Sequence, residues 1–79
     1  MKWQDYIEEN PKILGGKPIF TGTRISVELV LERLAAGETE EQLIRQYPTL
    51  RPEHIRAAFG FAATQLSLMR SVLLDEEAV

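Results

Sequence analysis

The spacing of apolar residues predicts two short helices in the middle of the chain. The first covers about residues 27–36, where an apolar stripe follows Ser26, a favoured N-cap residue, and Gly37 stands where a left-handed residue often ends a helix. The second covers about residues 40–46, and Thr39 begins it as the first residue of a capping box.

The third predicted helix is much longer than the other two. It runs from Pro52, a residue suited to the first helical position, to about residue 74, a length of about 34 Å. The two short helices cannot cover this length. Along it, the apolar positions are separated by four and three residues in turn. These positions are Ile55, Phe59, Ala62, Leu66, Met69 and Leu73.

The second half of the long helix is therefore either buried by another surface or frays in solution. We predict that a second copy of the chain provides that surface, in a homodimer that buries Leu66, Met69 and Leu73. The alternative is that the stripe packs within the chain, on the N-terminal segment that carries Trp3 and Tyr6.

A short β-hairpin is predicted ahead of the helices, over about residues 17–26. The two runs 17–20 and 23–26 are compatible with strands, and Gly22 between them can supply the positive φ of a tight turn. The segment before Pro11 fits either a turn of helix or an edge strand.

Composition indicates one globular domain over residues 1–79. The chain is 44% hydrophobic, carries 4 prolines, and has no cysteine and a single histidine. This composition predicts no disulfide, metal site or cofactor. There is no long apolar stretch and no apolar core of a signal peptide, so we expect no membrane association and a cytoplasmic location.

The sequence offers little for catalysis, and we predict that the protein is not an enzyme. Lys17 is followed by Pro18, whereas a phosphate-binding loop needs Ser or Thr after its lysine. No pair of carboxylates stands out from ordinary helix charges. His54, the one imidazole, is expected to be an exposed residue of a first helical turn.

The second and third helices can also be interpreted as a helix-turn-helix unit, in which the start of the later helix enters the major groove of DNA. The side chains available there are Arg45, Arg51, His54 and Arg56. The alternative is an ordinary helix hairpin, which Glu53 favours because it would lie poorly beside phosphates. A net charge of −3 argues against binding by bulk electrostatics.

Arg24 falls in the middle of a predicted strand, where a guanidinium must be paired or solvated. We expect it to pair inside the chain with Asp5 or Glu28. The alternative is that Arg24, together with Lys17, contacts a partner protein.

The residues GGKPIFTGTRISV, then a helix ended by glycine, then YPTLRPEHIRAA, closely resemble the family called domain of unknown function 433. The resemblance runs from about Trp3 to Ala63. It implies a homeodomain-like three-helix fold with a leading β-hairpin. It also implies a small DNA-binding antitoxin associated with PIN-like ribonuclease toxins of the Vap type. Where relatives tend to have a threonine N-cap before the last helix, this chain has Arg51.

The sequence therefore leaves two candidate functions. The first is an antitoxin of a type II toxin–antitoxin pair, which binds a PIN-like toxin and, as a homodimer, operator DNA. The second is a protein-interaction module that uses the hairpin and the long helix and never binds DNA. The three arginines Arg45, Arg51 and Arg56 favour the first, and the acidic balance of the chain favours the second.

Overall fold

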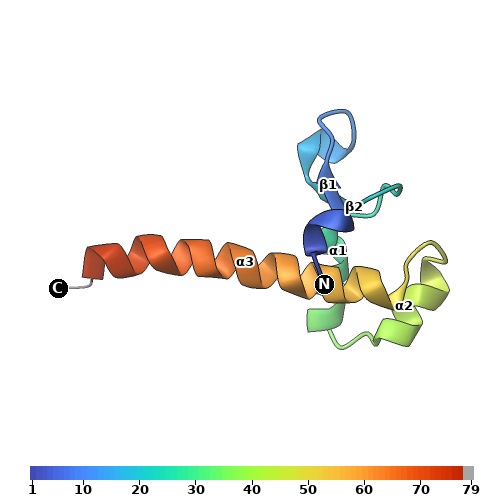
Figure 1. The fold of residues 1–79 in the computed structure, drawn as a ribbon. Helices are drawn as coiled ribbons and strands as arrows, with labels where there is room; N and C mark the ends of the chain where they lie inside the picture. Colours follow the sequence, from blue (N-terminus) through green and yellow to red (C-terminus); the bar gives the residue numbers. More distant parts are fainter. Residues whose placement is uncertain (78–79) are drawn as a thin grey trace.

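The structure is a computed structural model that describes the backbone of residues 1–77 and the side chains of residues 1–70. It is mainly helical, with three α-helices and a two-stranded antiparallel sheet (Figure 1). The elements are a 3-10 turn η1 (Trp3–Asp5), strand β1 (Ile7–Glu9), a second 3-10 turn η2 (Leu14–Gly16), strand β2 (Pro18–Phe20), and helices α1 (Val27–Ala35), α2 (Glu40–Gln46) and α3 (Pro52–Glu77).

The helix ends lie close to where local signals predict them. The Ser26 hydroxyl accepts a hydrogen bond from the Leu29 N–H, and Thr39 forms the predicted capping box with Gln42. Gly37 has a φ of 99°, a value that side chains with a Cβ rarely adopt, and it ends α1 as predicted. Only α3 differs appreciably, because it continues to Glu77 rather than to about residue 74.

The predicted hairpin over residues 17–26 is wrong in its pairing. β2 pairs with β1, and the segment after Gly22 forms only one isolated bridge, between Ile19 and Ser26. The reason is the turn itself. The Thr23 hydroxyl donates to the Phe20 carbonyl and accepts from the Ile25 N–H. These bonds hold residues 21–25 in the turn, so they do not form a second strand before α1 begins. The register of the sheet is Ile7 with Phe20, Glu8 with Ile19, and Glu9 with Pro18.

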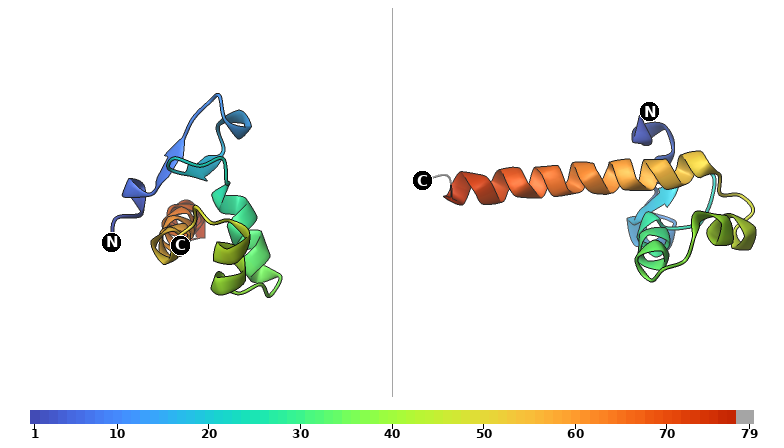
Figure 2. Two further views of the ribbon diagram at one scale, coloured as in Figure 1. Left: turned by 90° about the vertical axis from the view of Figure 1, so that its right-hand side faces the viewer. Right: turned by 90° about the horizontal axis from the view of Figure 1, so that it is seen from below.

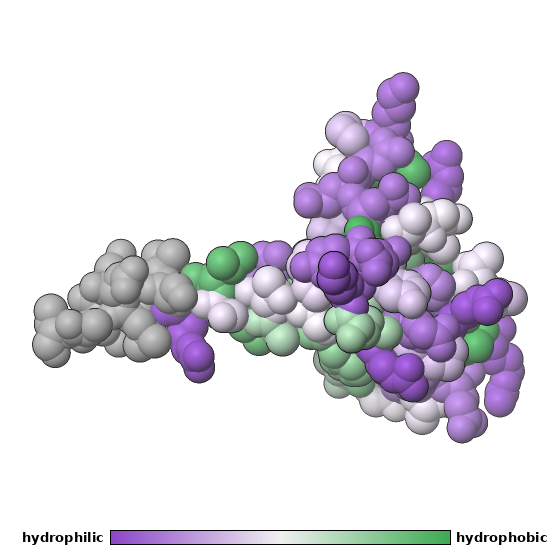
Figure 3. All heavy atoms as spheres, viewed as in Figure 1, coloured by the Kyte–Doolittle hydropathy of each residue, from purple (hydrophilic) through white to green (hydrophobic). Residues whose placement is uncertain are grey.

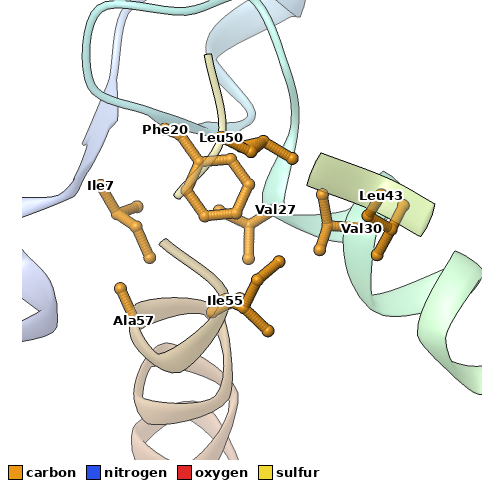
Figure 4. Packing of buried hydrophobic residues seen from close by; sticks show 9 residues of the cluster. Ile7, Phe20, Val27, Val30, Leu43, Leu50, Ile55 and Ala57 are labelled. Carbon is orange, nitrogen blue, oxygen red and sulfur yellow. The ribbon is translucent and has the colours of Figure 1, made fainter. Parts of the chain in front are cut away.

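The hydrophobic core lies where the hairpin meets the three helices. Figure 4 shows its side chains converging around Phe20 and Val27. Two alanines of α3, Ala57 and Ala58, are completely buried, so α3 passes close to the other elements. Besides these four residues, the core contains Ile7, Val30, Leu43, Leu50 and Ile55.

The N-terminal segment packs on the middle of α3. The indole of Trp3 lies edge to face with Phe61, with ring centroids 5.0 Å apart, and its Nε1–H donates to the Thr64 hydroxyl at 3.1 Å. Gly60 makes room for the ring, because a Cβ there would lie 3.3 Å from Cδ1 of Trp3. Viewed along α3, the helix lies between this segment and the pair α1 and α2 (Figure 2, left).

Beyond Thr64, α3 leaves the rest of the molecule. Both side views show it extending away from the body as a single helix (Figure 1; Figure 2, right). The predicted alternative of packing on Trp3 and Tyr6 therefore holds for the middle of α3 and stops there. We call residues 65–77 the projecting half of α3.

Candidate functional site

The projecting half of α3 exposes large apolar side chains. Leu66 is 63% exposed, Leu68 60% and Met69 58%. Figure 3 shows hydrophobic side chains on this part of the helix, outside the body of the protein. Leu66 and Met69 are two of the three residues predicted to form a dimer. The third, Leu73, has its side chain outside the described residues. A surface of this kind on a small protein indicates a contact with another molecule.

A second apolar surface lies between α1 and α3, and the sequence did not predict it. It is a groove of about 440 Å³, whose floor and walls come from α1, from Phe61 of α3 and from Pro18 of β2. The α1 residues follow one another at intervals of one turn, so they form a straight edge. They are the apolar residues Val27, Leu31 and Ala35, with Glu28 and Glu32 beside them.

The signal for this groove was present in the sequence, since Leu31 lies four residues after Val27. Val27 is indeed buried, but Leu31 is only partly buried and Ala35 is exposed. Apolar spacing reveals which face of a helix is apolar. It does not reveal where the neighbouring element stops, and here α3 covers only part of the α1 stripe.

The three arginines of the predicted DNA surface lie at the junction of α2 and α3. Arg45 is in the last turn of α2, Arg51 immediately precedes α3, and Arg56 is in the first turns of α3. All three side chains are exposed, and none forms an ion pair within the described chain. They are therefore available to an anionic ligand.

His54 differs from the prediction, because it is half-buried rather than exposed. Its ring lies edge to face with Phe20, with centroids 5.4 Å apart, and with Tyr6 at 5.8 Å. Its Nδ1 accepts a hydrogen bond from the Arg51 N–H at 2.9 Å. Burial is the main cause that lowers the pKa of His54; the nearby Glu53 raises it and Arg51 lowers it. A DNA contact by His54 stays a prediction, and only Nε2 is left to make it.

Lys17 and Arg24 are both exposed near the hairpin, but not in the predicted arrangement. Lys17 Nζ lies 3.3 Å from an oxygen of Glu28, and both side chains are 59% exposed. Arg24 lies in the turn before α1 rather than in a strand, and within the part of the chain that the structure describes it pairs with neither Asp5 nor Glu28. The prediction of an internal ion pair is wrong, because the turn directs Ile25 inward and Arg24 outward.

The described residues contain neither a cluster suited to a metal ion nor a helix that could cross a membrane. No group of three or more histidine, cysteine, aspartate or glutamate side chains is placed to hold a metal ion. None of the helices in this part of the chain is long and apolar enough to cross a membrane.

Comparison with known proteins agrees with the resemblance in the sequence. Residues 7–62 match the family model described as "Protein of unknown function (DUF433)". Over 59 residues, 75% of the chain, it is 37% identical to the "Uncharacterized protein y4eO" of Sinorhizobium fredii (strain NBRC 101917 / NGR234). The chain spans only 27% of the length of that relative.

A solved structure has the same fold. It is the crystal structure of a DUF433 member protein from Anabaena variabilis ATCC 29413 at 2.00 Å resolution, with 25% sequence identity and a TM-score of 0.75. The match covers 86% of this chain and 67% of that one. Because the family model covers well over half of the sequence and the fold agrees with that of a solved member, this chain belongs to the DUF433 family.

Proposed function

We propose that this protein acts by binding, not by catalysis, as the antitoxin of a type II toxin–antitoxin pair in the cytoplasm. The observation that carries a binding function is the projecting half of α3, on which Leu66, Leu68 and Met69 are each more than half exposed. Apolar patches of this kind mark protein interfaces. The identity of the partner, a PIN-like ribonuclease toxin, is supported by the resemblance to antitoxin-like members of the family.

The proposal includes binding of operator DNA by a homodimer. In it, α2 and α3 act as a homeodomain-like helix-turn-helix, with the start of α3 in the major groove. The exposure of Arg45, Arg51 and Arg56 at the α2–α3 junction supports this assignment. Arg56 is suited to a guanine edge, and Arg51, at the helix start, to a phosphate.

The toxin contact is proposed to include the exposed basic residues beside the hairpin. Arg24 is free of ion pairs within the described chain, and Lys17 has only a solvent-exposed partner, Glu28. An exposed pair of this kind contributes little to stability, so a partner's carboxylate can replace Glu28 at small cost.

A specific observation also favours the second function, a protein-interaction module that does not bind DNA. The first turn of α2 carries the exposed acids Glu40 and Glu41, and Glu53 stands next to Pro52 at the start of α3. These carboxylates would repel a phosphate backbone that approached the same end of the molecule.

Two experiments test the proposal. In the first, the full chain is titrated onto a duplex from immediately upstream of its own coding sequence. The antitoxin proposal expects half-saturation below about 10 μM at low salt, where even non-specific DNA binders are detected. Absence of binding at that concentration would refute the DNA part and leave the interaction module.

The second experiment concerns the toxin. A PIN-like reading frame adjoining the gene is expressed alone, where it should arrest growth, and then together with this chain, which should restore growth. A variant with both Lys17→Glu and Arg24→Glu should restore growth less well, while Lys2→Glu, on an exposed residue that precedes η1 and lies outside the hairpin, serves as the control. The absence of such a reading frame, or arrest that this chain does not relieve, refutes the antitoxin function.

A further inference from the structure

We propose that the groove between α1 and α3 receives the projecting half of α3 from a second copy of the chain, and that the exchange is reciprocal. The inference rests on the homodimer of the proposed function and goes beyond it, because it assigns the groove as the receptor surface. The two copies are then related by a two-fold axis, and each supplies one helix and one groove.

The first observation is that one apolar face of α3 runs from the groove onto the projecting half. Phe61, which lines the groove, and Leu68, which is 60% exposed, are seven residues apart and therefore lie on the same face of the helix. Met69 follows directly. The rest of the chain therefore covers this apolar face only within the body, and the part of the face on the projecting half is exposed to water (Figure 3).

A two-fold axis joins these two parts of the face. In an antiparallel pair of α3 helices with the axis beside Gln65, Leu68 and Met69 of one copy lie opposite Phe61 and Ala62 of the other. The exposed apolar residues of one chain therefore meet the groove wall of its partner, and the same contact is repeated on the other side of the axis.

The dimensions of the helix and the groove agree. The α1 edge of the groove runs from Val27 to Ala35, which is about 12 Å of helix. Because α1 runs across α3 (Figure 2, left), a helix antiparallel to α3 crosses this edge, and the projecting half, with residues 65–77 and a length of about 20 Å, is long enough to do so. An amphipathic helix lying in an apolar groove is a common mode of recognition.

Local charge supports a second copy as the occupant, although the far end of the projecting half is acidic in the sequence, with Asp75, Glu76 and Glu77. Two acids flank the groove, and Lys17 neutralises only one of them, Glu28. Glu32 is exposed and forms no ion pair within the described chain. In the sequence, Arg70 is the only basic residue of the projecting half, and its side chain is exposed. An ion pair between Glu32 and the second copy's Arg70 would set the register of the two helices.

The absence of cysteine from the sequence allows a direct test by crosslinking. Ala35→Cys places a thiol at the exposed end of the groove, and Leu68→Cys or Met69→Cys places one on the helix. When the Ala35→Cys protein is mixed with either helix variant and mildly oxidised, we expect a disulfide-linked band of twice the chain mass. Glu41→Cys, an exposed position on α2, is the control for Ala35→Cys and should give much less of that band.

Charge reversal tests the register in solution. Glu32→Arg and Arg70→Glu are each expected to raise the dimer dissociation constant by about fivefold or more in sedimentation experiments, and the double variant should restore it. Glu41→Arg should leave the dissociation constant unchanged. All positions are on the surface, so the fold should be retained.

Three results would overturn the inference: a wild-type chain that is monomeric at micromolar concentration, crosslinking no stronger than that of the control, or a double variant no tighter than the single ones. These measurements contain neither DNA nor toxin. A failure of the inference is therefore distinguishable from a failure of the antitoxin function, which growth rescue reports.

Discussion

His54 acts at the start of α3 as a cap that uses the imidazole in place of the usual glutamate or glutamine. It is the third residue of the helix, and its Nδ1 accepts the Arg51 N–H at 2.9 Å, as the side chain at this position does in a capping box. The accepting nitrogen must be unprotonated. A proton there would remove the bond and place a positive charge at the positive end of the helix dipole.

This cap should make stability depend on pH. Burial, partly offset by Glu53 and assisted by Arg51, lowers the pKa of His54 from its ordinary 6.5. The unfolded chain therefore binds the proton more readily than the folded one. The stabilisation is complete above the ordinary pKa and is lost as the pH falls from there towards the lower folded value.

We expect His54→Gln to remove this dependence, because glutamine keeps an acceptor at the same helical position and does not titrate. Thermal unfolding followed at a series of pH values from about 7.5 to 5 provides the measurement. The wild-type midpoint should fall with pH more steeply than that of the variant. Parallel curves for the two proteins would show that His54 does not titrate with folding.

Gly22 presents a second prediction at the scale of one residue. Its φ is 79°, and an added Cβ would meet nothing within 4 Å, so any cost of substitution comes from the backbone. Gly22→Val should lower the free energy of unfolding by more than about 1 kcal/mol, because β-branched residues strongly disfavour positive φ. Gly22→Asn, which tolerates the left-handed region, should cost clearly less. Equal thermal midpoints for both variants and the wild type would contradict this account.

At the scale of elements, the contact of η1 with α3 holds the N-terminal segment against the middle of that helix. Trp3 contributes the ring packed on Phe61 and the hydrogen bond to Thr64, whose hydroxyl in turn donates to the Gly60 carbonyl. The contact lies just before the projecting half begins. It therefore marks the last point at which the chain itself supports α3.

Trp3→Ala should cost about 2 kcal/mol of unfolding free energy, less than for a fully buried tryptophan because Trp3 is only partly buried. Amide exchange should speed up more at residues 60–64 than at Ala57, which the core still buries. Thr64→Val is the matched control. It removes the hydrogen bond and keeps the shape, so it should cost about 1 kcal/mol. Uniform acceleration along α3 would mean that the contact does not act locally.

At the scale of the whole molecule, the proposed dimer would determine how DNA is bound. Two copies of the α2–α3 junction should recognise an inverted repeat with half-sites about 10 base pairs apart, or a multiple of that spacing. Charge-reversed variants that fail to dimerise should then lose affinity for the full repeat and keep their affinity for one half-site.

Arg51, just before α3, and Arg56, within it, should affect DNA binding differently. Arg56→Ala should cost about 1–3 kcal/mol and relax the preference at one base pair, whereas Arg51→Ala should weaken all sequences alike and lower the salt dependence by about one charge. Arg24→Ala, at the hairpin turn, is the control and should change neither. Titrations of matched and single-substituted duplexes at two salt concentrations measure both effects. Identical behaviour of the two variants would exclude separate roles.

The sequence by itself determined the three helices and their ends, except for the C-terminal end of α3. Ser26, Thr39 and Pro52 act on backbone groups within the next turn, and Gly37 acts on the turn before it, so each signal is complete in a few neighbouring residues. The excess length of α3 was also evident, because length follows from the number of residues. The exposure of Leu66 and Met69 confirms that the short helices do not cover it.

Only the tertiary structure decided which distant segments meet. In the sequence, residues that can form a strand lie both before and after β2. β2 pairs with β1 rather than with residues 23–26 because the turn after β2 includes most of those residues. His54 is half-buried because Tyr6 and Phe20, which are distant in the sequence, pack against its ring. The sequence also left open whether Lys17 or Arg24 would pair with Glu28, and in the structure it is Lys17. The groove exists because α3 crosses only part of the apolar edge of α1. The spacing of apolar residues within one helix does not show where a second helix will cross it.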